Sequence, residues 1–449
     1  MNTDQSIQEK NICILGLGHV GLTLALVMAD KGYNVIGFDT NQELIDTVRR
    51  KKSPILEPNI ESYLDRLMDK TLHATTDLQE ISADVYIITV GTPIDSESKT
   101  PNINYIKSAS ETIGDKIKKD DLVILRSTVP IGLSRNVVAP ILEERSGLKC
   151  GTDFLLSYSP ERTIEGEALK ELSELPQIVS GFNRDSSTYA EKIFSRITPN
   201  VIDVGSLESA EMVKIMNNTF RDVKFGYSNE MALICKDLGL DMVELVNFAN
   251  SGYKRDKIPV PSPGVGGACL SKDSYILNYS TKDIEHRPNI ISKARETNES
   301  IPLEILNSIE RDLKQINKSI EESKFYIIGF AFKGDPETAD IRGSTTIDFL
   351  MELKKKVSKR KIIFGYDPIV KSDEIESLDV KFVDFSEGFN EADVILFMNN
   401  HKSYNKLDIT DMLQSSSKDC ILFDGWHLFE PSVIGSVNKI KYQGVGCKF

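Results

Sequence analysis

One cysteine, Cys269, has neighbours whose types could make it a nucleophile. It lies in the segment Pro261–Leu277, directly after a glycine-rich turn that includes Gly266, and Lys272 and Asp273 follow it. Glycine lets the backbone adopt positive φ and lets a ligand approach closely. The thiolate is the reactive form of cysteine, and a neighbouring ammonium group favours that form. The ordinary alternative is a buried cysteine packed in a tight turn.

A second glycine-rich stretch has the pattern of a dinucleotide-binding turn. It reads GxGxxG and consists of Gly16, Leu17, Gly18, His19, Val20 and Gly21. It stands between an apolar run, Asn11–Leu15, and a helical pattern, Leu22–Lys31, so the glycines would bring a pyrophosphate to a helix N-terminus. The next apolar run, Asn34–Phe38, ends at Asp39, whose carboxylate would accept from a ribose 2′-OH. The two residues after Asp39 are uncharged, which favours NAD over NADP.

Polar residues follow three further apolar runs, Ala83–Val90, Leu122–Leu125 and Phe154–Tyr158. These polar residues are Thr92, Thr128, Glu161, Arg162 and Glu165. Ligands of an open parallel sheet bind at the carboxyl ends of its strands, so we expect a site here. Either glutamate could move protons or orient a water molecule. Each residue taken alone is better explained as a turn or helix-cap residue.

Two later segments add cationic side chains. Lys214 and Asn218 are four residues apart in the helical pattern Ser206–Gly239, so they share a helix face. Lys333 and Arg342 follow the apolar run Phe325–Gly329, where they could bind phosphate or carboxylate. The ordinary alternative for each of these charged residues is a solvated surface position.

The order of the patterns predicts an α/β fold in which two Rossmann-like, doubly wound parallel-sheet domains are joined by a central helical domain. We expect an NAD-binding domain at 1–205, a helical dimerisation domain at 206–310 and a C-terminal α/β domain at 311–449. The helical domain contains the patterns Met242–Asn250 and Arg295–Asp312. The later strand patterns are Phe325–Gly329, Lys361–Tyr366, Ala392–Met398 and Cys420–Asp424.

Composition limits the class of protein. At 449 residues the chain is too long for one core. A net charge of −13 argues against a general nucleic-acid or membrane-surface binder. The six cysteines form no CxxC pair and the five histidines have no metal-ligand spacing, so we expect a reducing compartment and no metal. Neither a signal-peptide core nor a transmembrane run is present, which predicts a cytoplasmic protein.

The sequence resembles the UDP-glucose/GDP-mannose dehydrogenase family over nearly its whole length. The motifs are GLGHVGL at 16–22, GTP at 91–93, STVP at 127–130, SPER at 159–162, AEMVKIMNNTFR at 210–221, GVGGACLSKD at 264–273 and FAFKGDPETADIR at 330–342. The resemblance implies oxidation of a nucleotide-sugar C6 alcohol to a uronic acid with two NAD⁺. It also implies a dimer through the central domain and a C-terminal domain that binds the nucleotide diphosphate.

The resemblance also implies roles for individual residues. Cys269 would be the covalent nucleophile, with Lys214 and Asp273 as proton-handling and water-orienting groups and Asn218 as an oxyanion-type donor. The water and proton network would comprise Glu161, Glu165 and Thr128. The cofactor side would comprise the glycine turn, Asp39, Thr92, Thr128, Lys272 and Arg342. Substrate would contact Glu161, Arg162, Lys214, Asn218, Arg255, Gly266, Phe332 and Lys333, with Arg255 reaching across the dimer.

The substrate is the least determined feature. SPER resembles the branch that oxidises UDP-N-acetylhexosamines, whereas Glu165 and Lys272 resemble the UDP-glucose branch. The loop at Arg255 departs from the His-Pro-Arg that is common in the N-acetyl branch. We favour a UDP-N-acetylhexosamine slightly over UDP-glucose, with GDP-mannose third.

Two other functions stay open. The first is a two-electron dehydrogenase of the hydroxyacid type, with Lys214 as base and Cys269 structural. The second is a non-catalytic regulator that binds NAD or a nucleotide sugar. The stoichiometry of NADH release separates these functions from a four-electron enzyme.

Overall fold

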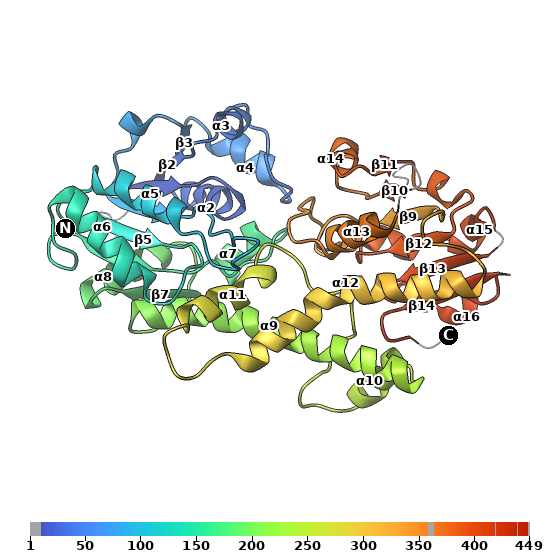
Figure 1. Ribbon diagram of the computed structural model, residues 1–449. Coiled ribbons are helices and arrows are strands. Elements are labelled where there is room, and N and C mark those ends of the chain that lie inside the picture. The colour runs from blue at the N-terminus through green and yellow to red at the C-terminus, as the bar shows by residue number, and fades with distance from the viewer. Residues whose placement is uncertain (1–9, 358–362, 418, 438, 448–449) are drawn as a thin grey trace. The chain divides into compact units, whose positions relative to one another are not determined.

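The computed structural model describes residues 10–357, 363–417, 419–437 and 439–447. They form two compact units. The first unit runs up to Asn217 and includes Tyr275–Arg287, and the second comprises Asn218–Ser274 and the chain from Pro288 onward. Figure 1 draws the strands of the first unit in blue to green and those of the second in orange to red. The boundaries expected at 205/206 and 310/311 stay a prediction.

The first unit contains an eight-stranded sheet with the order β3-β2-β1-β4-β5-β6-β7-β8. Its strands are β1 Asn11–Leu15, β2 Asn34–Phe38, β3 Leu72–Thr75, β4 Val85–Ile88, β5 Leu122–Leu125, β6 Leu155–Tyr158, β7 Gln177–Gly181 and β8 Val201–Asp203. Neighbouring strands are parallel except β6 and β7, which pair antiparallel through Ser157 and Gly181. The expectation of a parallel sheet is therefore correct for the strands that precede β7.

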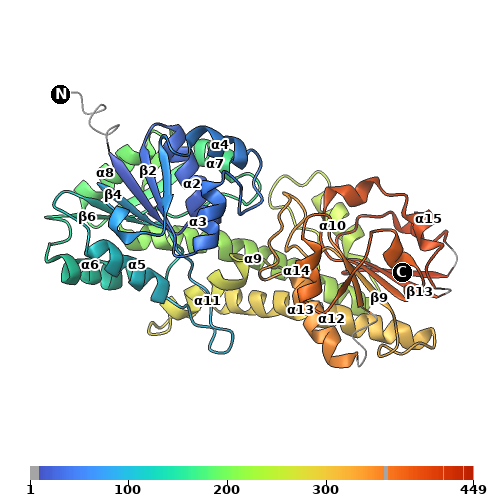
Figure 2. The same cartoon turned by 90° about the horizontal axis from the view of Figure 1, so that it is seen from above.

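Helices cover both faces of this sheet. They are α2 His19–Asp30, α3 Gln42–Arg49, α4 Ile60–Leu67, α5 Asn104–Gly114, α6 Ala139–Ser146, α7 Ala168–Glu174 and α8 Arg184–Phe194. Along β1, Ile12 and Ile14 pack with α2, α4, α7 and α8, whereas Cys13 and Leu15 pack with α5 and α6. Successive side chains of a strand point to opposite faces, so an uninterrupted apolar strand needs cover on both sides. Figure 2 shows α2 against the sheet.

Between β8 and the next strand the described elements are helical. They are α9 Leu207–Leu238, α10 Met242–Asn250, α11 Leu270–Ser280 and α12 Asn289–Gln315. The sequence predicted α9 to within a residue at each end and α10 without error, whereas α12 is longer than the expected Arg295–Asp312. No helix among the described residues has the length and hydropathy needed to cross a membrane.

The second unit contains a six-stranded parallel sheet with the order β11-β10-β9-β12-β13-β14. Its strands are β9 Phe325–Ile328, β10 Ile363–Tyr366, β11 Lys381–Phe382, β12 Val394–Phe397, β13 Cys420–Asp424 and β14 Ile440–Gly444. Its further helices are α13 Thr345–Lys356, α14 Ser372–Ser377, α15 Ile409–Leu413 and α16 Pro431–Ile434. Phe325 and Ile327 pack with α12 and α13, whereas Tyr326 and Ile328 pack with α15 and α16.

The prediction of two doubly wound α/β sheets with helices between them along the chain is confirmed. The strands that the sequence patterns missed are β3, β7, β8, β11 and β14. Most of these are short or partly polar, and β8 and β11 carry exposed residues. The central strands were found because they are continuous apolar runs that end in polar residues. The first part of the Lys361–Tyr366 pattern lies outside the described residues.

Candidate active site

The glycine turn of the first unit leaves open space at the N-terminus of a helix. Gly16 has φ +96°, and a Cβ on Gly21 would lie 1.7 Å from the Gly16 carbonyl oxygen, so neither position accepts another residue without rearrangement. A Cβ on Gly18 would meet no atom within 4 Å. The space over Gly18 is therefore open at the N-terminus of α2, which begins at His19. An anion is favoured at such a helix end.

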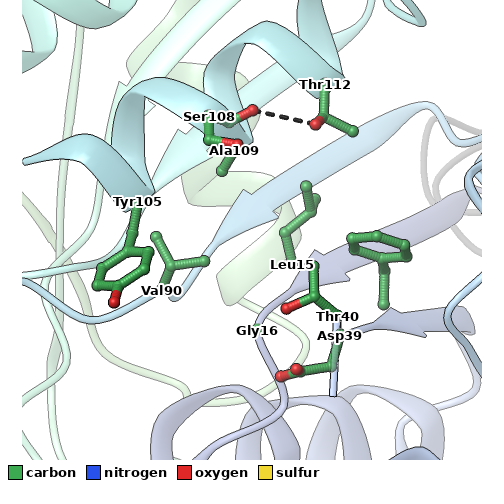
Figure 3. A pocket seen from close by; sticks show the side chains of 10 residues that line it. Leu15, Gly16, Asp39, Thr40, Val90, Tyr105, Ser108, Ala109 and Thr112 are labelled. Atoms are coloured by element: carbon green, nitrogen blue, oxygen red, sulfur yellow. Dashed lines mark hydrogen bonds between the residues drawn. The ribbon is translucent and has the colours of Figure 1, made fainter. Parts of the chain in front are cut away.

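Asp39 stands at the end of β2 and is held by backbone donors. Its carboxylate accepts from Leu17 N at 2.7 Å and from Asn41 N at 2.9 Å. A carboxylate has about four acceptor positions, so two remain for ribose hydroxyls. A pocket of about 130 Å³ lies beside it (Figure 3). Its lining is mainly apolar and consists of Leu15, Gly16, Phe38, Asp39, Thr40, Val90, Tyr105, Ser108, Ala109 and Thr112. These residues fit the adenosine half of NAD.

The carboxyl ends of β4 and β5 are tied together. The Thr92 hydroxyl donates to the Thr128 carbonyl oxygen at 2.5 Å. Thr92 is buried, whereas Thr128 is partly exposed. The backbone after β5 is thus held by the loop after β4, as expected for two loops on one edge of a parallel sheet.

Glu161 forms an ion pair with a residue that the sequence analysis did not select. Arg126 is 1 % exposed, and it donates to Glu161 Oε2 from Nη2 at 2.6 Å and from Nε at 3.1 Å. The other carboxylate oxygen accepts from the N–H groups of Arg162 and Thr163 at 2.7 and 2.8 Å. Burial alone would raise the pKa of Glu161, but the Arg126 charge and the Thr163 N–H hold it below its ordinary value, and Lys214 adds to this effect.

Three more predicted residues lie in the first unit, namely Glu165, Lys214 and Arg162. Glu165 Oε1 is 3.9 Å from His19 Nδ1, so the SPER loop approaches the glycine turn. Lys214 is 8 % exposed, which contradicts the alternative of a solvated helix lysine. Arg162 is exposed, and its guanidinium donates to the Pro176 carbonyl at 3.3 Å, so its predicted contact with substrate stays a prediction.

In the second unit, Cys269 immediately precedes α11. Its carbonyl oxygen accepts from Asp273 N at 3.1 Å, which closes the first turn of the helix. All six cysteines lie among the described residues, and Cys269 is the exposed one. Burial raises the pKa of Cys13, Cys150 and Cys420 to about 12, so these thiols are inert. The alternative of a buried Cys269 is therefore wrong.

A buried amide–carboxylate pair lies one turn into α11. Asn218 Nδ2 donates to Asp273 Oδ2 at 2.6 Å, and the two residues are 8 % and 1 % exposed. The other oxygen, Asp273 Oδ1, is buried and has no hydrogen-bond partner among the described residues. An unsatisfied buried carboxylate oxygen costs free energy, so this atom is suited to a water or substrate donor.

The glycines before Cys269 pack against the loop that follows β9. A Cβ on Gly267 would lie 2.7 Å from the Phe332 ring, and one on Gly266 would lie 2.1 Å from the Gly343 carbonyl oxygen. The Lys333 ammonium is 5.6 Å from the centre of the Phe332 ring. The second unit thus brings the predicted residues Gly266, Phe332 and Lys333 to one region.

The remaining predicted residues have more ordinary surroundings. Arg342 is paired with Asp340, with Nη2 to Oδ2 at 2.5 Å. Lys272 is partly exposed in the first turn of α11, and Arg255 is exposed in the loop after α10. Their roles in binding cofactor or substrate stay predictions. Arg126 could have been selected from the sequence because it is a charged residue directly after the buried run Leu122–Leu125.

Comparison with known proteins agrees with this geometry. Three models of the UDP-glucose/GDP-mannose dehydrogenase family match in order: the NAD binding domain at residues 10–198, the central domain at 208–300 and the UDP binding domain at 326–431. The UDP-N-acetyl-D-mannosamine dehydrogenase of Pyrococcus horikoshii is 32 % identical over 97 % of this chain and 99 % of its own. The NDP-N-acetyl-D-galactosaminuronic acid dehydrogenase of Ralstonia solanacearum is 30 % identical over 91 % of this chain and 95 % of its own.

A solved structure has the same fold. That of the UDP-D-ManNAc dehydrogenase from Pyrococcus horikoshii superposes with a TM-score of 0.88 at 29 % identity, covering 97 % of this chain and 99 % of that one. The glycine turn, Asp39 and the adjoining pocket lie within residues 10–198, which match the NAD binding domain. The chain belongs to the UDP-glucose/GDP-mannose dehydrogenase family and is an NAD-dependent nucleotide-sugar dehydrogenase.

Proposed function

We propose that the enzyme oxidises the C6 alcohol of a UDP-N-acetylhexosamine to the uronate in a four-electron reaction through a covalent bond to Cys269. The observation that carries the proposal is the exposed thiol at the start of α11, followed one turn later by Asp273 with its unpartnered oxygen. A two-electron dehydrogenase would need neither group.

The proposed chemistry balances in four steps. Two NAD⁺ molecules would bind in turn to the first unit, and each would supply the hydride acceptor for one of the two oxidations. Lys214 takes the proton of the C6 hydroxyl as the aldehyde forms. The Cys269 sulfur then loses its proton and bonds to the aldehyde carbon, and that proton passes to the carbonyl oxygen, giving a thiohemiacetal. Loss of the second hydride to the second NAD⁺ and of the hydroxyl proton to solvent gives a thioester. Water then attacks the thioester and breaks the carbon–sulfur bond, which releases carboxylate and thiol, and the remaining proton passes to Asp273.

The other side chains are given supporting roles. Asp273 orients the hydrolytic water and takes its proton through Oδ1. Asn218 has two amide hydrogens, of which one is bound by Asp273, and the other stabilises the oxyanion of the tetrahedral species. Glu161 stays ionised because of Arg126 and acts as a fixed negative charge, while Glu165 and Thr128 belong to the water network.

The choice of sugar rests on the relatives and on SPER at 159–162. Both named relatives are dehydrogenases of N-acetylated sugars. Glu165 and Lys272 favour UDP-glucose as the second candidate, and GDP-mannose is the third. The match to a UDP binding domain over 326–431 supports a uridine nucleotide.

The experiment is NADH release at completion with a panel of sugars. The panel comprises UDP-ManNAc, UDP-GalNAc, UDP-GlcNAc, UDP-glucose and GDP-mannose. Two NADH per molecule of one sugar are expected. One NADH would favour a two-electron dehydrogenase, and tight binding without any NADH would favour a regulator.

The role of the cysteine is tested separately. We predict that Cys269→Ser forms no uronate but binds NADH with unchanged affinity, because the glycine turn, Asp39 and Thr92 lie in the first unit and Cys269 lies in the second. The matched control, Cys447→Ser, changes a half-buried thiol that lies in the second unit, as Cys269 does, and this variant is expected to stay active. A fully active Cys269→Ser enzyme would refute covalent catalysis.

We also propose a homodimer through the central helices. Phe220, Tyr227, Ile234 and Leu238 are exposed on α9 at intervals of seven or four residues, so they share one face, and Phe248 is exposed on α10. Large exposed apolar surfaces usually mark interfaces. Light scattering should give a mass of twice the chain mass for the wild-type protein. Phe220→Glu should reduce the measured mass. The control Met351→Glu changes an exposed apolar residue on α13 and should leave the mass unchanged. An unchanged mass for Phe220→Glu would contradict this interface.

A further inference from the structure

A buried arginine on α12 holds the loop that carries the cysteine. Arg295 is 2 % exposed, and it donates from Nη2 to the Val265 carbonyl at 2.9 Å and from Nη1 to the Leu270 carbonyl at 3.2 Å. Val265 and Leu270 lie on either side of Cys269. One rigid guanidinium therefore contacts both ends of the segment 265–270, here named the cysteine loop.

The same arginine is paired with a carboxylate on α9. Asp222 is fully buried and accepts from Arg295 Nη1 at 3.0 Å. Its second oxygen accepts from the Ser274 hydroxyl at 3.0 Å, directly after Asp273. Asp222 thus fixes the orientation of Arg295 and also contacts the first turn of α11. Burial raises the pKa of Asp222 although Arg295 opposes this, so the pair is strongly desolvated.

Close packing of α9 and α12 makes these contacts possible. A Cβ on Gly226 would lie 2.7 Å from the Ala294 Cβ, so glycine is what allows this approach. Asp222, Gly226 and Asn229 are four and three residues apart, hence on one face of α9. Asn298 on α12 donates to Asp222 Oδ1 at 2.8 Å and accepts from Asn229 at 2.9 Å.

The hydrogen bonds continue to the residues before the cysteine loop. Asn229 Oδ1 accepts from Ser262 N at 2.9 Å, and the Ser262 hydroxyl donates to the Gly264 carbonyl at 2.9 Å. The network therefore supports the backbone before, within and after the loop. Replacing a buried ion pair by apolar residues is often neutral or stabilising, so global stability alone does not account for this arrangement.

We propose that Arg295 and Asp222 are positioning residues that hold the cysteine loop so that the Cys269 thiol is correctly placed relative to Asp273. The proposal rests on the proposed function, because it concerns the thiol that forms the covalent bond. Neither residue is assigned a contact with substrate. Their effect is on the placement of a reacting atom, and misplacement by about 1 Å can cost roughly 100-fold in rate.

The test uses two conservative variants. Arg295→Lys keeps a positive charge beside Asp222 but cannot donate to both carbonyls, and Asp222→Asn keeps the shape but removes the charge. The matched control is Lys318→Met. Lys318 also binds a carboxylate and a backbone carbonyl in the second unit, those of Asp393 and Asp419.

Two readouts distinguish positioning from general stability. Hydrogen–deuterium exchange of residues 262–272 should speed up about tenfold in Arg295→Lys and less in Asp222→Asn, with the strands β9, β12 and β13 unchanged. In steady state, kcat should fall about tenfold or more, while KM changes less than about threefold and NADH affinity stays the same. Lys318→Met should leave both the exchange of residues 262–272 and kcat unchanged.

Three results would overturn the proposal. In the first, Arg295→Lys leaves the exchange of residues 262–272 unchanged. In the second, Arg295→Lys speeds up exchange throughout the second unit. In the third, Arg295→Lys speeds up exchange at 262–272 but leaves kcat unchanged. If the wild-type enzyme forms no NADH with any sugar of the panel, the proposed function fails. The exchange data would still decide whether Arg295 holds the loop.

Discussion

The buried pair of Arg126 and Glu161 gives the sharpest stability prediction. In Arg126→Met, the Glu161 carboxylate keeps its two backbone donors but loses its charged partner. The side chains of the two residues are 0 % and 11 % exposed, so solvent replaces little of the loss. Removing one partner of a buried ion pair lowers the free energy of unfolding by about 3–5 kcal/mol, and we expect Arg126→Met to lower it by an amount in this range.

The double variant isolates the interaction. Glu161→Gln keeps an acceptor for Arg126 and should cost less, about 1–3 kcal/mol. The double variant, Arg126→Met with Glu161→Gln, removes both charges and so leaves no unpaired buried charge. Its loss of unfolding free energy should therefore be smaller, by at least about 2 kcal/mol, than the sum of the losses in the two single variants. The assay is chemical denaturation followed by far-UV circular dichroism. Trp426, the one tryptophan of the chain, lies in the second unit, and its fluorescence reports that unit separately.

Additivity would refute the reasoning. If the double variant costs the sum of the two single changes within about 0.5 kcal/mol, Arg126 and Glu161 do not stabilise one another. If Arg126→Met costs less than about 1 kcal/mol, the pair is not buried from solvent in the way described here.

Two further predictions concern the glycine turn and a buried glutamate. Gly21→Ala should abolish NADH binding, measured by calorimetry, because its Cβ would clash with the Gly16 carbonyl oxygen. Gly18→Ala should fold normally and bind NADH only more weakly, because its Cβ would meet no other atom within 4 Å. Equal effects of the two variants on NADH affinity would contradict this geometry. Glu211 accepts from the N–H groups of Gly132 and Ser134, and burial nevertheless raises its pKa from 4.5 to about 7. The folded state therefore binds the extra proton between these pH values, so stability should fall as pH rises from about 4.5 to 7, by up to about 3 kcal/mol at 1.36 kcal/mol per pKa unit. Thermal melts of wild type and Glu211→Gln across this range should diverge, and parallel curves would show that Glu211 does not titrate there.

Much of the fold followed from local patterns. The runs Asn11–Leu15, Asn34–Phe38, Leu122–Leu125 and Cys420–Asp424 were predicted without error, because buried parallel strands are apolar on both faces. The strand β7 was missed, and its antiparallel pairing with β6 was not anticipated. Strand direction depends on which segments pair in the sheet. A short apolar segment alone does not show whether its strand pairs parallel or antiparallel.

For the candidate site, the sequence by itself determined which residues are chemically able to act. It pointed to Cys269, Asp273, Lys214 and the glycine turn, because their types and spacing are local features. Only the tertiary structure decided that Cys269 is exposed and that Lys214 is buried.

The partners of these groups were also decided by tertiary structure. Arg126 and Glu161 are 35 residues apart in the chain, and Arg295 and Asp222 are 73 apart. A pair so distant in sequence forms only when strand ends or helix faces pack together. Burial then makes the pairing necessary, because a charge removed from water needs a partner. The sequence shows which side chains can act, and the packing of distant segments determines their exposure and their partners.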